Sequence, residues 1–131
     1  MINIFMSGCN GRMGQVISRL VSQSEDFNIA AGFDLNDSIN NPYPVYTNLN
    51  NCNLKVDVII DFSNPAALDS LLQYATKASV PIVIATTGLT QANMNMLETA
   101  SKKIPVFRSA NMSLGVNLLI DLVKKAAKVL E

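Results

Sequence analysis

The residues best suited to chemistry form a turn with three regularly spaced glycines, GCNGRMG, at positions 8–14. The turn lies between a short apolar run, Ile2–Met6, and a segment whose apolar residues recur at helical spacing. Glycine lets a backbone turn tightly and approach a ligand closely, and a helix that follows presents unpaired N–H groups to an anion. The pattern predicts a turn that binds the pyrophosphate of a dinucleotide. The alternative is an ordinary tight connection between a strand and a helix.

Two charged residues extend this prediction. Asp34 follows Gly14 by about 20 residues, at the end of the second predicted strand, where a carboxylate binds the adenosine ribose of a dinucleotide. Arg12 lies inside the turn and could lie over adenine or meet a ribose 2′-phosphate. The alternatives are a solvated turn aspartate and a solvent-exposed arginine. Together the glycine turn and Asp34 favour nucleotide binding more strongly than either does alone.

The other candidate residues carry weaker signals. Thr86 and Thr87 follow an apolar run, and Asn111 follows another; Asn111 could bind a carboxamide or cap a turn. Cys9 has no identifiable base beside it in the sequence, so we interpret it as a small side chain and not as a nucleophile. Met13 is most simply a filler at the edge of the core.

Composition limits the classes of protein that fit. The chain has 131 residues, of which 49% are hydrophobic and 15% charged, so a packed domain is expected and a disordered chain is not. Ten basic residues balance ten acidic ones, which argues against a nucleic-acid partner. No apolar run approaches the ~18 residues of a membrane span, and no signal peptide is visible at the N-terminus. Two cysteines indicate a reducing compartment, so we expect a cytoplasmic protein, with no metal site.

Predicted strands and helices alternate along the chain. Apolar runs predict strands at Ile2–Met6, Asn28–Phe33, Val56–Phe62, Pro81–Ala85 and Pro105–Arg108. Helices are expected from the glycine turn to about Gln23, after Asn64-Pro65, after Thr90 and after Ser113. The Asn-rich stretch Asp34–Asn53 is expected to be a loop with a short extended piece at Val45 and Tyr46. The pattern predicts a Rossmann-like, doubly wound α/β fold with a mainly parallel sheet and helices on both faces.

Four sequence pieces resemble a known family. GCNGRMG (8–14), DFSNP (61–65), ATTG (85–88) and SANMSLGVN (109–117) match, in order and spacing, the N-terminal half of the dihydrodipicolinate reductases. These enzymes are also called 4-hydroxy-tetrahydrodipicolinate reductases and serve lysine and diaminopimelate synthesis. The resemblance spans nearly the whole chain. It implies an NAD(P)H-binding domain over residues 1–131 of an enzyme that reduces a cyclic imine dicarboxylate with hydride from NADH or NADPH.

The resemblance also implies a role for each matching residue. The glycine turn would wrap the pyrophosphate, Asp34 would bind the adenosine ribose, and Thr87 would also approach the substrate. Phe62 and Ala85–Thr87 would lie along the nicotinamide ribose and ring, and Ser109–Met112 would meet the nicotinamide carboxamide. In that order, the implied cofactor-binding residues are Gly8, Cys9, Asn10, Gly11, Arg12, Met13, Asp34, Phe62, Ala85, Thr86, Thr87, Ser109, Ala110, Asn111 and Met112.

The sequence departs from the family's pattern at two points. Leu35 follows Asp34 where family members that use either cofactor well often have a basic residue. A 2′-phosphate beside Asp34 would be repelled, so we expect NADH to be preferred over NADPH, with Arg12 the residue most able to reverse this. The family's histidine pair, lysine and Pro-Ser-Gly-Thr loop are missing, and the chain has no histidine.

We therefore expect this chain to be the cofactor-binding part of a longer protein, without the substrate domain and without catalytic residues. It would bind the nucleotide but not catalyse. The parent enzyme would be a homotetramer with a small-molecule substrate, and this chain alone a monomer or a weak dimer. Two alternatives remain: a free-standing NAD(H)-sensing domain, and a Rossmann reductase of the aspartate-semialdehyde type. The second needs a nucleophilic cysteine, whereas Cys52 lies in the Asn-rich stretch.

Overall fold

A six-stranded, all-parallel sheet forms the centre of the computed structural model, which describes residues 1–130. Glu131, the last residue of the predicted domain, lies outside the described residues. The strand order is β3-β2-β1-β4-β5-β6, so β1 lies near the middle of the sheet and the chain reverses its direction of winding between β1 and β4. The strands are β1 Ile2–Ser7, β2 Phe27–Phe33, β3 Val45–Tyr46, β4 Val58–Asp61, β5 Ile82–Ile84 and β6 Val106–Arg108.

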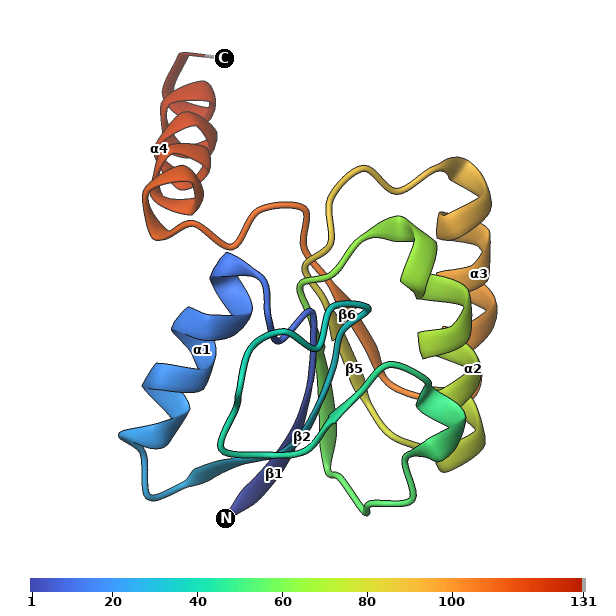
Figure 1. The fold of residues 1–131 in the computed structure, drawn as a ribbon. Helices are drawn as coiled ribbons and strands as arrows, with labels where there is room; N and C mark the ends of the chain where they lie inside the picture. Colours follow the sequence, from blue (N-terminus) through green and yellow to red (C-terminus); the bar gives the residue numbers. More distant parts are fainter. Residues whose placement is uncertain (131) are drawn as a thin grey trace.

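Helices cover both faces of this sheet, as predicted. Helix α1 lies on one face, and α2 and α3 lie together on the other (Figure 1). Alternate residues of the strands point into two cores, because side chains of a strand alternate between faces. Phe5 and Ile59 face α2 and α3, whereas Ile4 and Met6 face α1. The helices are α1 Arg12–Ser22, α2 Leu68–Ala78, α3 Gln91–Ser101 and α4 Leu114–Leu130, with short 3₁₀ turns η1 Leu49–Asn51 and η2 Pro65–Ala67.

Side-chain caps start the helices where the sequence predicts them. The Oδ1 atom of Asn64 accepts a hydrogen bond from the Ala66 N–H at the start of η2, which leads into α2. Thr90 and Asn93 form a reciprocal capping box at the start of α3. Ser113 accepts a bond from the Val116 N–H at the start of α4. These bonds satisfy N–H groups that have no partner inside the helix.

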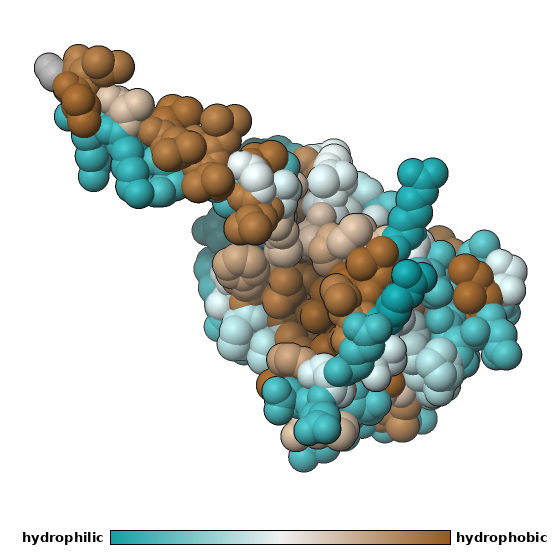
Figure 2. Space-filling view, turned by 90° about the vertical axis from the view of Figure 1, so that its left-hand side faces the viewer, coloured by the Kyte–Doolittle hydropathy of each residue, from teal (hydrophilic) through white to brown (hydrophobic). Residues whose placement is uncertain are grey.

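Helix α4 stands apart from the sheet. It projects from the body in Figure 1, and each of its residues is exposed. Apolar surface gathers along one side of this helix in Figure 2, and Leu118 and Leu119 are among its exposed apolar residues. The apolar residues of α1 are also partly uncovered: Met13, Val16 and Leu20 are exposed, and Gly14 is the residue of that helix that is buried. Met13, which the sequence analysis places at the edge of the core, is 47% exposed and belongs to neither cluster of buried residues.

Within residues 1–130, no helix combines the length and the apolarity that crossing a membrane requires.

Candidate functional site

The carboxyl ends of the parallel strands meet at one edge of the sheet, where the winding reverses between β1 and β4. Ligands of such sheets bind in the crevice at this point. Two neighbouring cavities of about 220 and 370 Å³ lie there, and Phe62 and Ser63 contribute to both. The smaller is lined by Gly8, Gly11, Phe33, Asp34, Leu35, Phe62, Ser63, Asn64 and Ala67. The larger is lined by Met13, Phe62, Ser63, Ala85, Thr86, Thr87, Ser109, Ala110, Asn111 and Met112.

The glycine turn is shaped by close backbone contacts. Gly8 has φ +76°, and a Cβ atom placed there would lie 2.5 Å from the carbonyl oxygen of Phe62. A Cβ at Gly14 would overlap the backbone of Gly8 and Cys9, so glycine lets α1 start directly against the turn. Gly11 precedes α1 and supplies no side-chain cap. The first N–H groups of α1 are therefore left for an anion at the helix N-terminus.

Asp34 lies against this turn, as the sequence predicts. Its Oδ2 atom accepts a hydrogen bond from the Asn10 N–H at 3.0 Å, and its Oδ1 atom accepts one from the Asn36 N–H, also at 3.0 Å. The carboxylate thus joins the glycine turn to the loop after β2, at the wall of the smaller cavity. Each oxygen can accept a further hydrogen bond, so the group remains able to bind a pair of hydroxyls.

Amide side chains order the Asn-rich stretch against the glycine turn. Asn10 bonds to both Asn36 and Asn41. Gln15 of α1 donates to the carbonyl oxygen of Cys9 and to Asn41. The hydroxyls of Ser18 and Tyr43 lie 2.6 Å apart. These bonds hold the Asn-rich stretch against the start of α1. Sequence patterns do not reveal this order, because the bonded residues lie far apart in the chain.

The residues predicted to bind the nicotinamide half of the cofactor line the larger cavity. Some of their side-chain atoms already bond to other parts of the protein and are not free to bind a ligand. Thr86 is 3% exposed, and its hydroxyl donates to Asp61 at 2.7 Å, so this side chain points into the protein. The Oδ1 atom of Asn111 accepts a bond from the Ser113 N–H, which realises the turn-capping alternative for that oxygen. Ala85, Thr87 and Met112 line the cavity directly.

Cys9 is fully buried, so its side chain does not reach the surface of the turn. A Cβ at Gly32 would lie 2.6 Å from the Cys9 Sγ atom, which shows how closely β2 packs on this thiol. Burial, and next the charge of Asp34, raise the pKa of Cys9 to about 11. The thiol is therefore protonated at neutral pH, which supports its interpretation as a small packing residue.

We expect Cys9 to be unreactive toward a thiolate-selective reagent in the folded chain at pH about 8, and to react once the chain is unfolded. Cys52→Ala removes the other thiol, so the labelling rate reports Cys9 alone. Because the folded pKa is raised from 9.0 to about 11, the stability contributed by the protonated thiol is present below pH 9 and is lost as the pH rises through 11. Rapid labelling of the folded Cys52→Ala chain would contradict the burial of Cys9.

The alkaline loss of stability needs its own control. Burial also raises the pKa of Tyr43 and Tyr74, so these groups weaken the fold in the same direction at high pH. Comparison of Cys52→Ala with the double variant that adds Cys9→Ala isolates the contribution of Cys9. The free energy of unfolding, measured in urea at both ends of the pH window, should fall less in the double variant.

Asp61 is a residue of this region to which the sequence analysis assigned no role, and several cavity-lining residues, Ser63 among them, were also left without one. Asp61 is a fully buried acidic residue at the end of an apolar strand, and it bonds to both Ser63 and Thr86. A sequence signal existed, because a charged residue stands at the next-to-last position of the apolar run VDVIIDF, near a predicted strand end.

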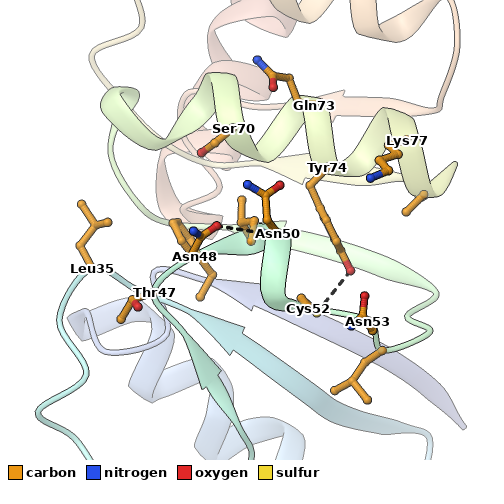
Figure 3. A pocket seen from close by; sticks show the side chains of 14 residues that line it. Leu35, Thr47, Asn48, Asn50, Cys52, Asn53, Ser70, Gln73, Tyr74 and Lys77 are labelled. Carbon is orange, nitrogen blue, oxygen red and sulfur yellow. Dashed lines mark hydrogen bonds between the residues drawn. The ribbon is translucent and has the colours of Figure 1, made fainter.

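A larger hollow of about 740 Å³ lies between η1 and α2 (Figure 3) and adjoins the smaller cavity, with which it shares Phe33 and Leu35. The connection from β3 to β4 contains only the short turn η1, so no long helix fills the space beside α2. Asn50 and Asn53 face Gln73, Tyr74 and Lys77 across it. Cys52 is buried at its wall, where it accepts a hydrogen bond from the Tyr74 hydroxyl at 3.4 Å. This cysteine does not follow a strand of the crevice, where the aspartate-semialdehyde alternative would need a nucleophile.

Among residues 1–130, no group of three or more His, Cys, Asp or Glu side chains is placed to hold a metal ion.

The strand order, the glycine turn before α1 and the carboxylate after β2 define a Rossmann-type nucleotide-binding domain. Residues 2–112 match the family model described as dihydrodipicolinate reductase, N-terminus. The chain belongs to the dihydrodipicolinate reductase family, of which it represents the N-terminal part.

Relatives and solved structures agree with this assignment. Over 131 residues the chain is 49% identical to a 4-hydroxy-tetrahydrodipicolinate reductase of Caldanaerobacter subterraneus subsp. tengcongensis. The match covers 100% of this chain and 52% of that protein. It is 44% identical to the reductase of the same name from Rickettsia akari, of which it covers 51%. The chain therefore spans about half the length of the curated relatives it matches.

The fold is shared with solved structures. A dipicolinate-bound dihydrodipicolinate reductase from Paenisporosarcina sp. TG-14 matches with a TM-score of 0.79 at 24% identity, over 97% of this chain and 54% of that one. A homoserine dehydrogenase from S. aureus matches with a TM-score of 0.64 at 15% identity, over 83% of this chain and 32% of that one. At these identities the likeness concerns the fold.

Proposed function

We propose that residues 1–131 form the cofactor-binding domain of a 4-hydroxy-tetrahydrodipicolinate reductase, and that this domain binds NADH in preference to NADPH. The observation that carries the proposal is the contact of the Asp34 carboxylate with the glycine turn at the wall of the smaller cavity. A pyrophosphate site and a ribose site must be neighbours for a dinucleotide to bind, and here they share the backbone of Asn10.

Each part of the site has a proposed partner on the nucleotide. The start of α1 and Gly8–Met13 bind the pyrophosphate, because the turn has no room for a side chain at Gly8 and the helix N-terminus attracts anions. Asp34 accepts hydrogen bonds from the adenosine ribose hydroxyls. The larger cavity, between Phe62 and Asn111, holds the nicotinamide and its ribose.

In this proposal the residues of this chain bind and orient the cofactor. The nicotinamide, when bound, supplies a hydride for reduction of a cyclic imine dicarboxylate. Thr87 is exposed at the rim of the larger cavity, where it can approach the substrate. The histidine pair and the lysine that the family uses for the substrate have no counterpart here, so we propose that this chain alone binds the cofactor without catalysing.

The preference for NADH follows from charge. A 2′-phosphate would lie beside the Asp34 carboxylate, and Leu35 beside it offers no compensating positive charge. Arg12 is exposed at the first position of α1 and is the basic side chain of the turn itself. We propose that it lies at the adenosine end of the nucleotide, where it partly offsets this repulsion.

Calorimetric titration of the chain with NADH and with NADPH tests the proposal. We expect NADH to bind more tightly, and Asp34→Ala to weaken NADH binding by about tenfold or more, since a hydrogen bond to a charged group contributes about 1.5–3 kcal/mol. The same substitution should bring the affinities for the two nucleotides closer together. Asp37→Ala is the matched control, because Asp37 is an exposed aspartate of the same loop.

The possible outcomes separate the two parts of the proposal. Failure of the unchanged chain to bind either nucleotide at millimolar concentration would overturn it. Tighter binding of NADPH would overturn only the stated preference and would point to Arg12, whose replacement by alanine should then remove the advantage of NADPH.

A further inference from the structure

Three buried polar side chains lie at the carboxyl ends of three neighbouring strands. Within the described residues, Ser7, Asp61 and Thr86 are the polar or charged residues that are buried. Ser7 ends β1 and is in register with Asp61 at the end of β4, and Thr86 follows β5. Ser7 and Asp61 come two residues after Phe5 and Ile59, so they share the face of the sheet that carries α2 and α3. This group of three polar side chains therefore lies directly beneath the crevice.

Asp61 is the centre of this group. Its Oδ1 atom accepts hydrogen bonds from the Ser63 N–H at 3.2 Å and from the Ser63 hydroxyl at 2.5 Å. Its Oδ2 atom accepts one from the Thr86 hydroxyl at 2.7 Å. An acidic group is costly to bury and is retained only where hydrogen bonds compensate. Here every one of those bonds goes to a residue that lines the larger cavity.

These bonds add side-chain links between two loops whose first residues the sheet already joins, since the Ala85 N–H donates to the Asp61 carbonyl oxygen at 2.9 Å. Ser63 belongs to the turn after β4, and Thr86 to the segment after β5. The same turn carries Phe62, whose carbonyl oxygen lies against Gly8. The Phe62–Ser63 turn and Ala85–Thr87 both line the larger cavity, and the Asp61 carboxylate is bonded to a side chain of each.

We propose that Asp61 is a positioning residue for the nicotinamide half of the cofactor. It does not touch the nucleotide; it holds the turn after β4 against the segment after β5 so that the larger cavity has the shape of the nicotinamide and its ribose. This inference rests on the proposed function. It goes beyond that function because it gives a role in cofactor binding to a buried residue that does not line either cavity.

Asp61→Asn tests this role, because the change keeps the shape of the side chain but replaces one accepting oxygen by an NH₂ group. The ligands are NADH and ADP-ribose, which lacks the nicotinamide. In the unchanged chain NADH should bind more tightly than ADP-ribose. In Asp61→Asn we expect the affinity for NADH to fall by about tenfold, toward that for ADP-ribose, while the affinity for ADP-ribose changes by less than about twofold.

Two further variants make the test specific. Thr86→Val removes one hydroxyl that bonds to Asp61 and leaves both bonds to Ser63, so it should shift NADH affinity in the same direction by a smaller factor. If thermal unfolding shows that Asp61→Asn does not fold, Thr86→Val is the variant that tests the proposal. Asp69→Asn is the control, because Asp69 is exposed on α2 and bonds only to Gln73. The fluorescence of saturating NADH adds a readout of the nicotinamide environment, and it should change in Asp61→Asn but not in Asp69→Asn.

Each other outcome overturns the inference. Equal losses for NADH and ADP-ribose would show that Asp61 supports the fold as a whole. Unchanged NADH affinity and fluorescence in a folded Asp61→Asn chain would show that the two loops keep their places without it. If the unchanged chain binds ADP-ribose as tightly as NADH, the larger cavity is not a nicotinamide site, although nucleotide binding itself stands. If it binds neither ligand, the proposed function fails as well.

Discussion

Replacement of Gly8 by alanine is expected to remove measurable NADH binding and to lower the free energy of unfolding by about 2 kcal/mol or more. The residue has φ +76°, which a side chain disfavours. The added Cβ would lie 2.5 Å from the Phe62 carbonyl oxygen and 2.9 Å from the Ser63 nitrogen, closer than packed atoms approach. The turn after β4 would have to move, and it lines both cavities of the crevice. Urea unfolding and calorimetric titration measure the two effects.

Gly115→Ala is the matched control for this substitution. Gly115 lies in the first turn of α4, and its added Cβ would meet only the Ser113 hydroxyl oxygen, at 3.9 Å. Because alanine favours a helix by up to about 1 kcal/mol over glycine, this variant should be as stable as the unchanged chain or slightly more stable, and should bind NADH equally well. A Gly8→Ala chain that behaves like Gly115→Ala would contradict the close contact between the glycine turn and Phe62.

The second large effect is expected in the core between the sheet and α2. Leu71 is fully buried on α2, among the residues that face Phe5 and Ile59. Leu71→Ala should lower the free energy of unfolding by about 2–5 kcal/mol, because it removes buried methyl groups and leaves a cavity that the sheet cannot close. For a chain of this size that is a large part of the total stability, so the midpoint of urea unfolding should move clearly.

The same substitution on α4 should have almost no effect. Leu119 is 60% exposed and lies on a helix that contributes no buried residue. Leu119→Ala should change the free energy of unfolding by no more than about 0.5 kcal/mol. Comparable losses for Leu71→Ala and Leu119→Ala would mean that α4 packs on the body in solution, contrary to its projecting position in Figure 1.

Local signals explain why much of the fold could be predicted. Asn64 and Thr90 cap helices where their side chains and the following residues predict it, because a cap involves only a few neighbouring residues. The short strand at Val45 and Tyr46 was also predicted correctly, whereas the 3₁₀ turn η1 in the same Asn-rich stretch was not predicted. The positions of Asp34 and of the glycine turn follow from their places at strand ends, because parallel strands end at one edge of the sheet.

Features that depend on distant parts of the chain could not be predicted in the same way. The strand predicted to begin at Val56 begins at Val58, where its pairing with β1 starts. Val56 is apolar because it is buried, although it lies in the segment before the strand. The bond between Asp61 and Thr86 joins two strand ends, and the order of the Asn-rich stretch depends on Asn10 and Gln15. Helical periodicity in α1 shows that a helix forms but not how much of its apolar face is covered, as Met13 illustrates.

The central place of β1 also determines when the sheet can assemble during synthesis. Strand β1 is synthesised well before its partner on one side, β4, with Ile4 paired to Val58. About 50 further residues must be made before that pairing is possible, which takes several seconds at the usual rates of translation. Parallel pairing over such a separation forms slowly, because the intervening chain must first be ordered. Until β4 emerges, β1 of the nascent chain can pair with β2 on one side only, and its other edge stays open to a chaperone or to a neighbouring nascent chain during that interval.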